Sequence, residues 1–209
     1  MLEHMILYYV HDPMCSWCWG FSPTWTRLCA QLPDTVEVNY LLGGLAPDSK
    51  EPMPKEMQEM IAGYWRRIQQ HIPGTEFNFD FWQQCEPKRS TYPACRAIIA
   101  ARKQQPEIEQ SMIKAIQEAY YLNAKNPSDE ETLISLAESL GLDKARFTTD
   151  LNAADTQQQL EKEIQFSREI GAQGFPGMIV EVDGKYEHLP LDYNDPDNIL
   201  NAILRVMKR

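Results

Sequence analysis

Short apolar runs lie near both ends of the chain, while most of the middle repeats its apolar positions at helical spacing. Residues 5–10 form an unbroken apolar run that is too short for a buried helix and favours a buried strand. Residues 35–42 alternate before turning apolar, which predicts a second strand. Between them, residues 15–31 predict a helix that Pro23 must kink. If that helix is a crossover connection, the two strands are parallel.

A block of helices is predicted to follow. Residues 55–70, 93–103, 106–121, 143–151 and 155–170 each place apolar side chains along one helical stripe. Ser128 with Glu131 three residues later has the pattern of a capping box, and Gly141 is a natural stop for the helix it would begin.

The last forty residues return to strands. The glycine-rich residues 171–177 break the helical pattern. Residues 178–182 and 186–189 are predicted strands joined by Asp183-Gly184, a strong hairpin signal. Asp195-Pro196 then begins a final helix. The predicted class is therefore α/β, in the order β-α-β, a helical block, and β-β-α.

Composition excludes some classes of partner and bears on location. A formal net charge of -10 argues against a nucleic acid or an anionic membrane as partner. No window approaches the roughly 18–20 apolar residues that span a bilayer. The first residues lack the pattern of a secretory signal, which favours the cytoplasm, although a periplasmic protein whose signal had been removed would look the same.

The chemistry of the chain is concentrated in Cys15-Ser16-Trp17-Cys18, directly after the first predicted strand. At a helix start both sulfurs can face one way and close a small disulfide ring. The unpaired N–H groups and the helix dipole there favour a thiolate at the first cysteine. This pattern predicts a redox-active dithiol.

The other cysteines are expected to be reduced and buried. Five cysteines are an odd number, which fits poorly with a fully paired secreted framework. Cys29, Cys85 and Cys95 would then act as small apolar side chains. No second close pair of Cys or His residues is present to complete a zinc site, so no metal is expected.

Three segments carry a resemblance to a known family. They are Asp12-Pro13-Met14-Cys15-Ser16-Trp17-Cys18-Trp19-Gly20 with Pro23, the run Tyr92-Pro93-Ala94-Cys95-Arg96-Ala97, and Gly174-Phe175-Pro176. With these segments the chain resembles DsbA-like thiol–disulfide oxidoreductases, above all the bacterial predicted protein-disulfide isomerases with a DPxCxxCWG motif. The resemblance implies a thioredoxin fold with a large all-helical insertion. Residues 1–45 and 171–209 would form the core, and residues 46–170 the insertion and connecting helix.

The resemblance also implies roles for individual residues. Cys15 would be the exposed attacking thiolate, Cys18 the resolving thiol, and Pro176 a cis proline facing the dithiol. The backbone of Phe175 would pair with an extended substrate. The remaining residues expected to contact substrate are Ser16, Trp17, Trp19 and Gly174, with at least one of the two tryptophans exposed.

One departure from the family leaves a role open. Relatives commonly place a buried carboxylate six residues before the nucleophile, and Tyr9 stands there in this chain. His11 or Asp12 could take the proton of Cys18 instead. A histidine ending a strand and an aspartate forming a turn are the simpler interpretations of those two residues.

The resemblance favours a thiol–disulfide oxidoreductase or isomerase that acts on protein or peptide disulfides. It would need no resident cofactor, and glutathione or another thiol would be its redox partner. A second hypothesis is a glutathione-dependent transferase or isomerase of the kappa and 2-hydroxychromene-2-carboxylate isomerase type. There a serine usually replaces the cysteine, so Cys15 argues against it. A third is a cytoplasmic adaptor without catalysis that delivers a regulator to a protease and carries a redox-sensitive dithiol.

Two further groups of residues have both a functional and a structural interpretation. The aromatic residues 77–82 could line a groove for peptides or fill the seam between insertion and core, and the second is favoured. The basic residues could bind the carboxylates of glutathione or lie on solvated helix faces, namely Lys88, Arg89, Arg96 and Arg102.

Overall fold

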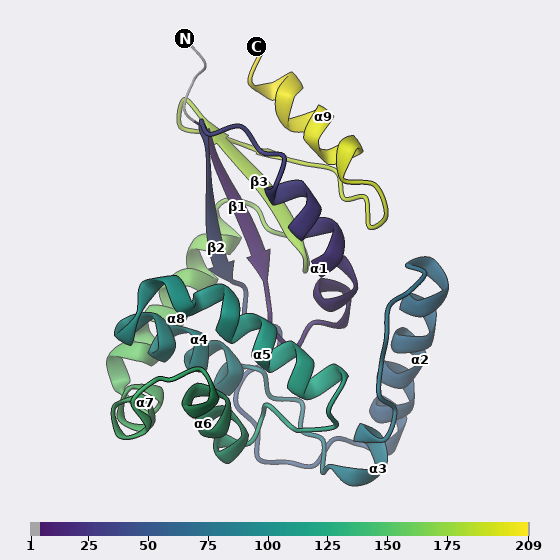
Figure 1. The fold of residues 1–209 in the computed structure, drawn as a ribbon, viewed down its shortest axis with the longest axis vertical. Helices are drawn as coiled ribbons and strands as arrows, with labels where there is room; N and C mark the ends of the chain where they lie inside the picture. Colours follow the sequence, from purple (N-terminus) through teal and green to yellow (C-terminus); the bar gives the residue numbers. More distant parts are fainter. Residues whose placement is uncertain (1–4, 209) are drawn as a thin grey trace.

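The computed structural model describes residues 5–208. Figure 1 shows a twisted sheet with helices on both faces and a layer of helices at one end. The strands are β1 (Met5–His11), β2 (Val36–Leu42), β3 (Gly177–Val182) and β4 (Lys185–His188). The helices are α1 (Ser16–Cys29), α2 (Lys55–His71), α3 (Phe81–Gln84), α4 (Tyr92–Gln104), the 3₁₀ turn η1 (Pro106–Ile108), α5 (Glu109–Tyr121), α6 (Glu130–Ser139), α7 (Lys144–Leu151), α8 (Ala154–Glu169) and α9 (Pro196–Val206).

The sheet has the mixed topology expected of a thioredoxin fold. Its strand order is β2-β1-β3-β4. β1 pairs in parallel with β2 through the crossover helix α1, as the sequence predicts, and antiparallel with β3. β3 and β4 form the predicted hairpin, with Asp183 at φ 51° and Gly184 at φ 70° as its turn residues.

The central strand β1 is buried on both faces, which explains its unbroken apolar sequence. Leu7 and Tyr9 pack in one cluster with residues of α1 and α9. Tyr8 and Val10 belong to the cluster on the opposite face, where Phe166 of α8 meets the ring of Tyr8 at 5.4 Å. The side-chain alternation of a strand therefore assigns α1 and α9 to one face and α8 to the other (Figure 1).

The helices α2 to α7 lie beyond the carboxyl ends of β1 and β2 (Figure 1) and have a core of their own. Its centre is Trp65 of α2, which is fully buried. Phe77, Phe79 and Trp82 surround its ring at centroid distances of 4.8, 5.5 and 4.9 Å. The aromatic segment therefore serves packing, as favoured above, but its rings pack inside this layer and not in the expected seam between insertion and core. The short helix α3 in it was not predicted.

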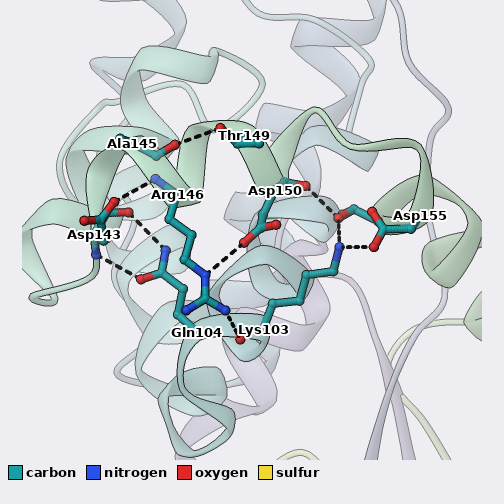
Figure 2. Close-up of polar contacts among 9 residues, drawn as sticks. Lys103, Gln104, Asp143, Ala145, Arg146, Thr149, Asp150 and Asp155 are labelled. Atoms are coloured by element: carbon teal, nitrogen blue, oxygen red, sulfur yellow. Dashed lines mark hydrogen bonds and ion pairs between the residues drawn. The ribbon is translucent and has the colours of Figure 1, made fainter.

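Polar contacts at the carboxyl end of α4 attach two later helices to it (Figure 2). Gln104 and the backbone of Asp143 exchange hydrogen bonds of 3.0 and 2.9 Å, and Asp143 caps α7 by accepting from Arg146 N at 2.7 Å. Lys103 reaches Asp155 at the start of α8 at 2.8 Å. These bonds hold α7 and the start of α8 against the carboxyl end of α4.

The expected capping box at Ser128 is wrong. The N-cap of α6 is Asp129, and its side chain makes no capping hydrogen bond. The Ser128 hydroxyl instead donates to the carbonyl oxygen of Ser90 at 2.7 Å, and Asp129 pairs with Lys88 at the same distance. Contacts between distant segments therefore replace the local cap.

Three of the four basic residues considered for glutathione lie in ion pairs within the chain. Lys88 pairs with Asp129, Arg96 with Asp48 at 2.7 Å, and Arg102 with Glu109 at 3.0 Å. Arg89 is exposed. Across residues 5–208, no helix is both long enough and apolar enough to cross a bilayer.

Candidate active site

The two cysteines lie where β1 ends and α1 begins. Cys15 is the N-cap of α1, and its carbonyl oxygen accepts from Trp19 N at 3.1 Å. Its sulfur thus lies at the positive end of the helix, as predicted. Both cysteines are free thiols in this structure.

Cys15 is enclosed, so its expected exposure is wrong. Only 6% of Cys15 and 1% of Cys18 is accessible to solvent. The thiol of Cys15 faces the loop before β3, where it donates to the carbonyl oxygen of Phe175 at 3.6 Å. A residue 160 positions away along the chain therefore covers the sulfur.

The loop over Cys15 contains the cis bond predicted from the resemblance, between Phe175 and Pro176. Pro176 is buried, Phe175 is half-buried and Gly174 is exposed. In residues 5–208 the amide N–H of Phe175 makes no backbone hydrogen bond, which leaves it available to an incoming chain.

Gly43, just after β2, packs directly against the Phe175 ring because it has no side chain. A Cβ atom added at Gly43 would lie 1.8 Å from a carbon of that ring, far inside contact distance. The phenyl ring therefore occupies the space that any other residue at position 43 would need. This contact determines where the backbone of Phe175 lies relative to Cys15.

We expect Gly43→Ala to displace Phe175 and weaken the site. Overpacking of this kind costs about 1–3 kcal/mol of unfolding free energy. A displaced loop should also slow the reaction of Cys15 with a peptide disulfide by about tenfold or more. Urea unfolding and stopped-flow kinetics measure the two effects. Gly63→Ala is the matched control, because a Cβ there meets nothing within 4 Å. Wild-type rate and stability in Gly43→Ala would contradict the assignment.

Asp12 anchors the loop that carries the dithiol. Its carboxylate is fully buried and accepts from Met14 N at 2.8 Å, Leu45 N at 2.7 Å, Thr91 Oγ1 at 2.6 Å and Cys95 Sγ at 3.5 Å. Burial raises the pKa of Asp12, while these hydrogen bonds lower it in part. The turn-forming aspartate of the motif thus binds the dithiol loop to α4.

Cys18 lies deeper, in a cage of aromatic rings. Burial is the main cause that raises the pKa of Cys18 well above its ordinary value, and the neighbouring Cys15 adds to it. Burial raises the pKa of the Tyr9 phenol well above its ordinary value, and the neighbouring Cys18 and Cys15 add to it. The ring of Tyr9 stacks on His11 at 5.4 Å and on Trp25 at 4.2 Å.

Ser16, Trp17 and Trp19, the residues between and beside the cysteines, each contact another part of the chain. Ser16 accepts from the indole N–H of Trp65 at 3.0 Å. Trp19 donates to the carbonyl oxygen of Glu76 at 3.0 Å. Trp17 packs beside Tyr193 at 5.1 Å. Both tryptophans are half-buried, so the expectation that one would be exposed is wrong.

Of the other cysteines, only Cys95 is buried, whereas Cys29 and Cys85 are partly accessible. Their expected burial is wrong because Cys29 is the last residue of α1, and Cys85 follows the short helix α3. Within residues 5–208, no group of three or more His, Cys, Asp or Glu side chains is arranged to hold a metal ion.

Sequence reasoning missed the partners that hold the site together. Thr91 and Gly43 were not singled out, and the Trp65 contact with Ser16 joins residues 49 positions apart. The run around Cys95 carried a signal, since it was one of the three segments of the resemblance. Its contact with Asp12 gives that run a physical role.

Comparison with solved structures gives close matches over the full chain. A protein from Nitrosomonas europaea, provisionally assigned as a protein disulfide isomerase, matches with a TM-score of 0.85 and 26% identity, covering 99% of this chain and 98% of that one. The cytosolic disulfide reductase DsbM from Pseudomonas aeruginosa matches at 0.77 and 24% identity, covering 96% and 99%. DsbA of the same organism matches at 0.60 and 16%, covering 100% and 84%, and so shares the fold.

Among curated proteins, the ClpXP adapter protein SpxH of Halalkalibacterium halodurans is 27% identical over 177 residues, which is 83% of this chain. The chain spans only 57% of the length of that relative. A family model described as Thioredoxin matches residues 8–195, nearly the whole chain. The chain therefore belongs to the thioredoxin family, in which it has the DsbA-like architecture.

Proposed function

We propose that this protein is a thiol–disulfide oxidoreductase acting on protein or peptide disulfides. The observation that carries the proposal is the position of the Cys15 sulfur. It lies at the amino end of α1, 3.6 Å from the carbonyl oxygen of Phe175, with Cys18 enclosed behind it. This arrangement provides a nucleophile, a backbone edge for the substrate and a second thiol to complete the exchange.

The reaction would proceed in two steps. The thiolate of Cys15 attacks one sulfur of the substrate disulfide, forms a mixed disulfide and expels the other sulfur as a thiolate. Cys18 then loses its proton and attacks the sulfur of Cys15. The bond between Cys15 and the substrate breaks, the second substrate sulfur leaves as a thiolate, and the protein is left with a Cys15–Cys18 disulfide.

The loop before β3 would hold the substrate in extended form. A peptide chain that runs beside Phe175 can accept from its free N–H and displace the Cys15 thiol from its carbonyl oxygen. Gly174 precedes Phe175 in the chain, and Trp17 packs on Tyr193, which lines the same pocket as Phe175. Both would contact the residues next to the substrate disulfide. Ser16 and Trp19 would act indirectly, because both are bonded to the helical insertion.

Relatives support this reaction class. The Nitrosomonas europaea protein shares the full length of the chain, and the Pseudomonas aeruginosa reductase has also been solved with GSH. Glutathione is therefore our proposed small thiol partner. Its recognition would depend on the Phe175 backbone, since Lys88, Arg96 and Arg102 already pair with carboxylates. The transferase hypothesis is less favoured because Cys15 replaces the usual serine.

A second candidate function is that of an adaptor. Its support is the likeness to an adapter protein named for ClpXP, which extends over most of this chain. An adaptor role would use the surface of the protein and would not need the Cys15 thiolate. The two functions can therefore be separated by one substitution at Cys15.

Replacing the resolving cysteine, Cys18, should trap the mixed disulfide between Cys15 and the substrate. In Cys18→Ala, Cys15 can still attack glutathione disulfide, but the mixed disulfide has no internal thiol to resolve it. We expect one glutathione per chain, located on Cys15 by mass spectrometry of peptides, and no such species in the wild type. Cys29→Ala is the control and should behave as wild type. An adduct at another cysteine, or none, would refute the proposal.

A further inference from the structure

A cavity of about 470 Å³ lies beside Cys18, between α1, α5 and the sheet. Its size falls within the range of about 300–1,000 Å³ that small-molecule sites occupy. Exposed side chains of α5, among them Gln110 and Lys114, lie at its rim, and buried residues of β1, α1 and α5 form its deeper wall. Phe175 and Pro176 line a different hollow, so the cavity is separate from the edge proposed for the substrate.

Aromatic rings make up much of the deeper wall. Tyr9 stacks on Trp25 with ring centroids 4.2 Å apart, and Tyr40 of β2 meets both of these rings edge-on at 5.6 and 6.0 Å. Ile113 of α5 adds an aliphatic surface. Walls of this kind favour an occupant that is itself planar and partly apolar.

Two buried polar side chains of this wall have no partner in the protein. His11 is 1% exposed, and its Nε2 makes no hydrogen bond with any described residue. Gln117 of α5 is 6% exposed, and its carboxamide makes no hydrogen bond within residues 5–208. Buried polar groups are nearly always paired, so two unpaired groups lining one cavity point to an occupant that can form hydrogen bonds.

The polar groups of the deeper wall are uncharged. Burial, with a smaller contribution from Arg102, lowers the pKa of His11 to about 3, so its imidazole is neutral near pH 7. Burial raises the pKa of Tyr40 to about 12, and its hydroxyl accepts from the indole N–H of Trp25 at 3.0 Å. At the rim, the opposite charges of Lys114 and Glu118 pair at 3.7 Å. A charged ligand would therefore lose its hydration without meeting an opposite charge in the deeper wall.

We propose that this cavity binds a small, uncharged, planar molecule that carries both a hydrogen-bond donor and an acceptor, such as an aromatic amide. The carboxamide of Gln117 offers the complementary donor and acceptor, His11 adds a second polar contact, and the ring of the ligand would pack against Tyr9 and Trp25. The inference goes beyond the function proposed above and does not depend on it. The ligand would lie beside Cys18 and leave the edge at Phe175 open.

The probe is 4-hydroxybenzamide, an uncharged aromatic amide, added to the isotope-labelled full chain and followed by nuclear magnetic resonance. We expect the signals of the Gln117 side-chain amide and the Trp25 indole N–H to shift and saturate, with a dissociation constant of about 1 mM or tighter. 4-Hydroxybenzoate has the same shape but a negative charge, and it should bind at least about tenfold more weakly. No saturation at about 10 mM of the amide would mean that the cavity holds only water, and would overturn the proposal.

Three variants locate the probe within the cavity. Gln117→Leu keeps the size of the side chain but removes its amide, and should weaken binding about fivefold. His11→Phe keeps a ring against Tyr9 and removes the nitrogens, and should weaken binding to a similar extent. Gln110→Leu is the matched control, because it makes the same replacement at the exposed rim, about two turns earlier on α5, and should bind as the wild type does.

Stability separates a ligand-binding role of Gln117 from a structural one. An amide without a partner in the protein contributes no hydrogen bond to the fold, so Gln117→Leu should melt at or above the temperature of the ligand-free wild type. If it melts lower, His11→Phe alone decides the outcome. Unchanged binding in both variants, or equal weakening in Gln110→Leu, would overturn the proposal.

The same titration of Cys15→Ser keeps the two proposals apart. Cys15 is not part of the cavity wall, so this variant should bind the probe as the wild type does, whatever its effect on disulfide exchange. Lost binding in Cys15→Ser would place the probe at the substrate edge and contradict the site. Failure of the oxidoreductase proposal, by contrast, would leave probe binding in the cavity unaffected.

Discussion

Replacing Cys15 by serine is expected to reduce disulfide exchange to the uncatalysed rate. The serine hydroxyl is nearly isosteric with the thiol but does not ionise near neutral pH, and the thiolate is the attacking species. The replacement keeps the N-cap of α1 and the contact with Phe175, so the unfolding free energy should stay within about 0.5 kcal/mol of wild type. Reduction of an insulin disulfide by the chain in the presence of glutathione measures the loss.

Cys29→Ser is the matched control, because it changes a partly accessible thiol at the other end of the same helix. Its activity should equal that of the wild type. Equal activity in Cys15→Ser would remove the basis of the oxidoreductase proposal. Purified ClpXP binding equally well to wild type and Cys15→Ser, with exchange lost only in the variant, would mean that both proposed functions exist on independent surfaces.

Replacing Asp12 by alanine is expected to be among the most damaging single changes to stability. It leaves four donors without their acceptor, three of them on other segments: Leu45 N, Thr91 Oγ1 and Cys95 Sγ. A buried donor left unsatisfied costs about 1–3 kcal/mol. With water able to reach some of them, we expect the unfolding free energy to fall by about 3 kcal/mol or more. Urea unfolding provides the measurement.

Two further variants make this result specific. Asp12→Asn keeps one acceptor oxygen but turns an amide towards a donor, so its loss should be intermediate. Asp34→Ala removes an exposed carboxylate before β2 and should change stability by no more than about 0.5 kcal/mol. If Asp12→Ala were as stable as Asp34→Ala, the anchoring role assigned to Asp12 would be wrong.

The order of strands and helices could be predicted from the sequence because each element carries its own local signal. The apolar run of β1, the turn residues Asp183-Gly184 and the capping Asp195 all act over a few residues. The start of α6 and the helix α3 were not predicted correctly, because both depend on residues that are distant in the sequence. Ser128 bonds to Ser90, and α3 forms where its aromatic rings meet Trp65. Tertiary contacts decide such positions, and local patterns do not contain them.

In the candidate site, too, local motifs predicted some features and only the fold could show the others. The dithiol and the Phe175–Pro176 loop could be named from motifs, but their enclosure could not. Cys15 is buried because a loop from the other end of the chain covers it, and that loop is seated on Gly43. The acceptor role of Asp12 likewise depends on Thr91 and Cys95, which only the fold brings to it. Motifs identify reactive groups, whereas the surroundings that tune them are assembled in three dimensions.

The bonds of Asp12 have a consequence for how this protein can be divided or recombined. A smaller scaffold, trimmed to the sheet with α1 and α9, would retain both cysteines and the covering loop. It would lose Thr91 and Cys95, and the carboxylate of Asp12 would lose the hydrogen bonds that these two residues donate. The helical insertion is therefore no detachable accessory. We therefore expect a functional transplant of the dithiol to require α4, the helix that completes its anchor.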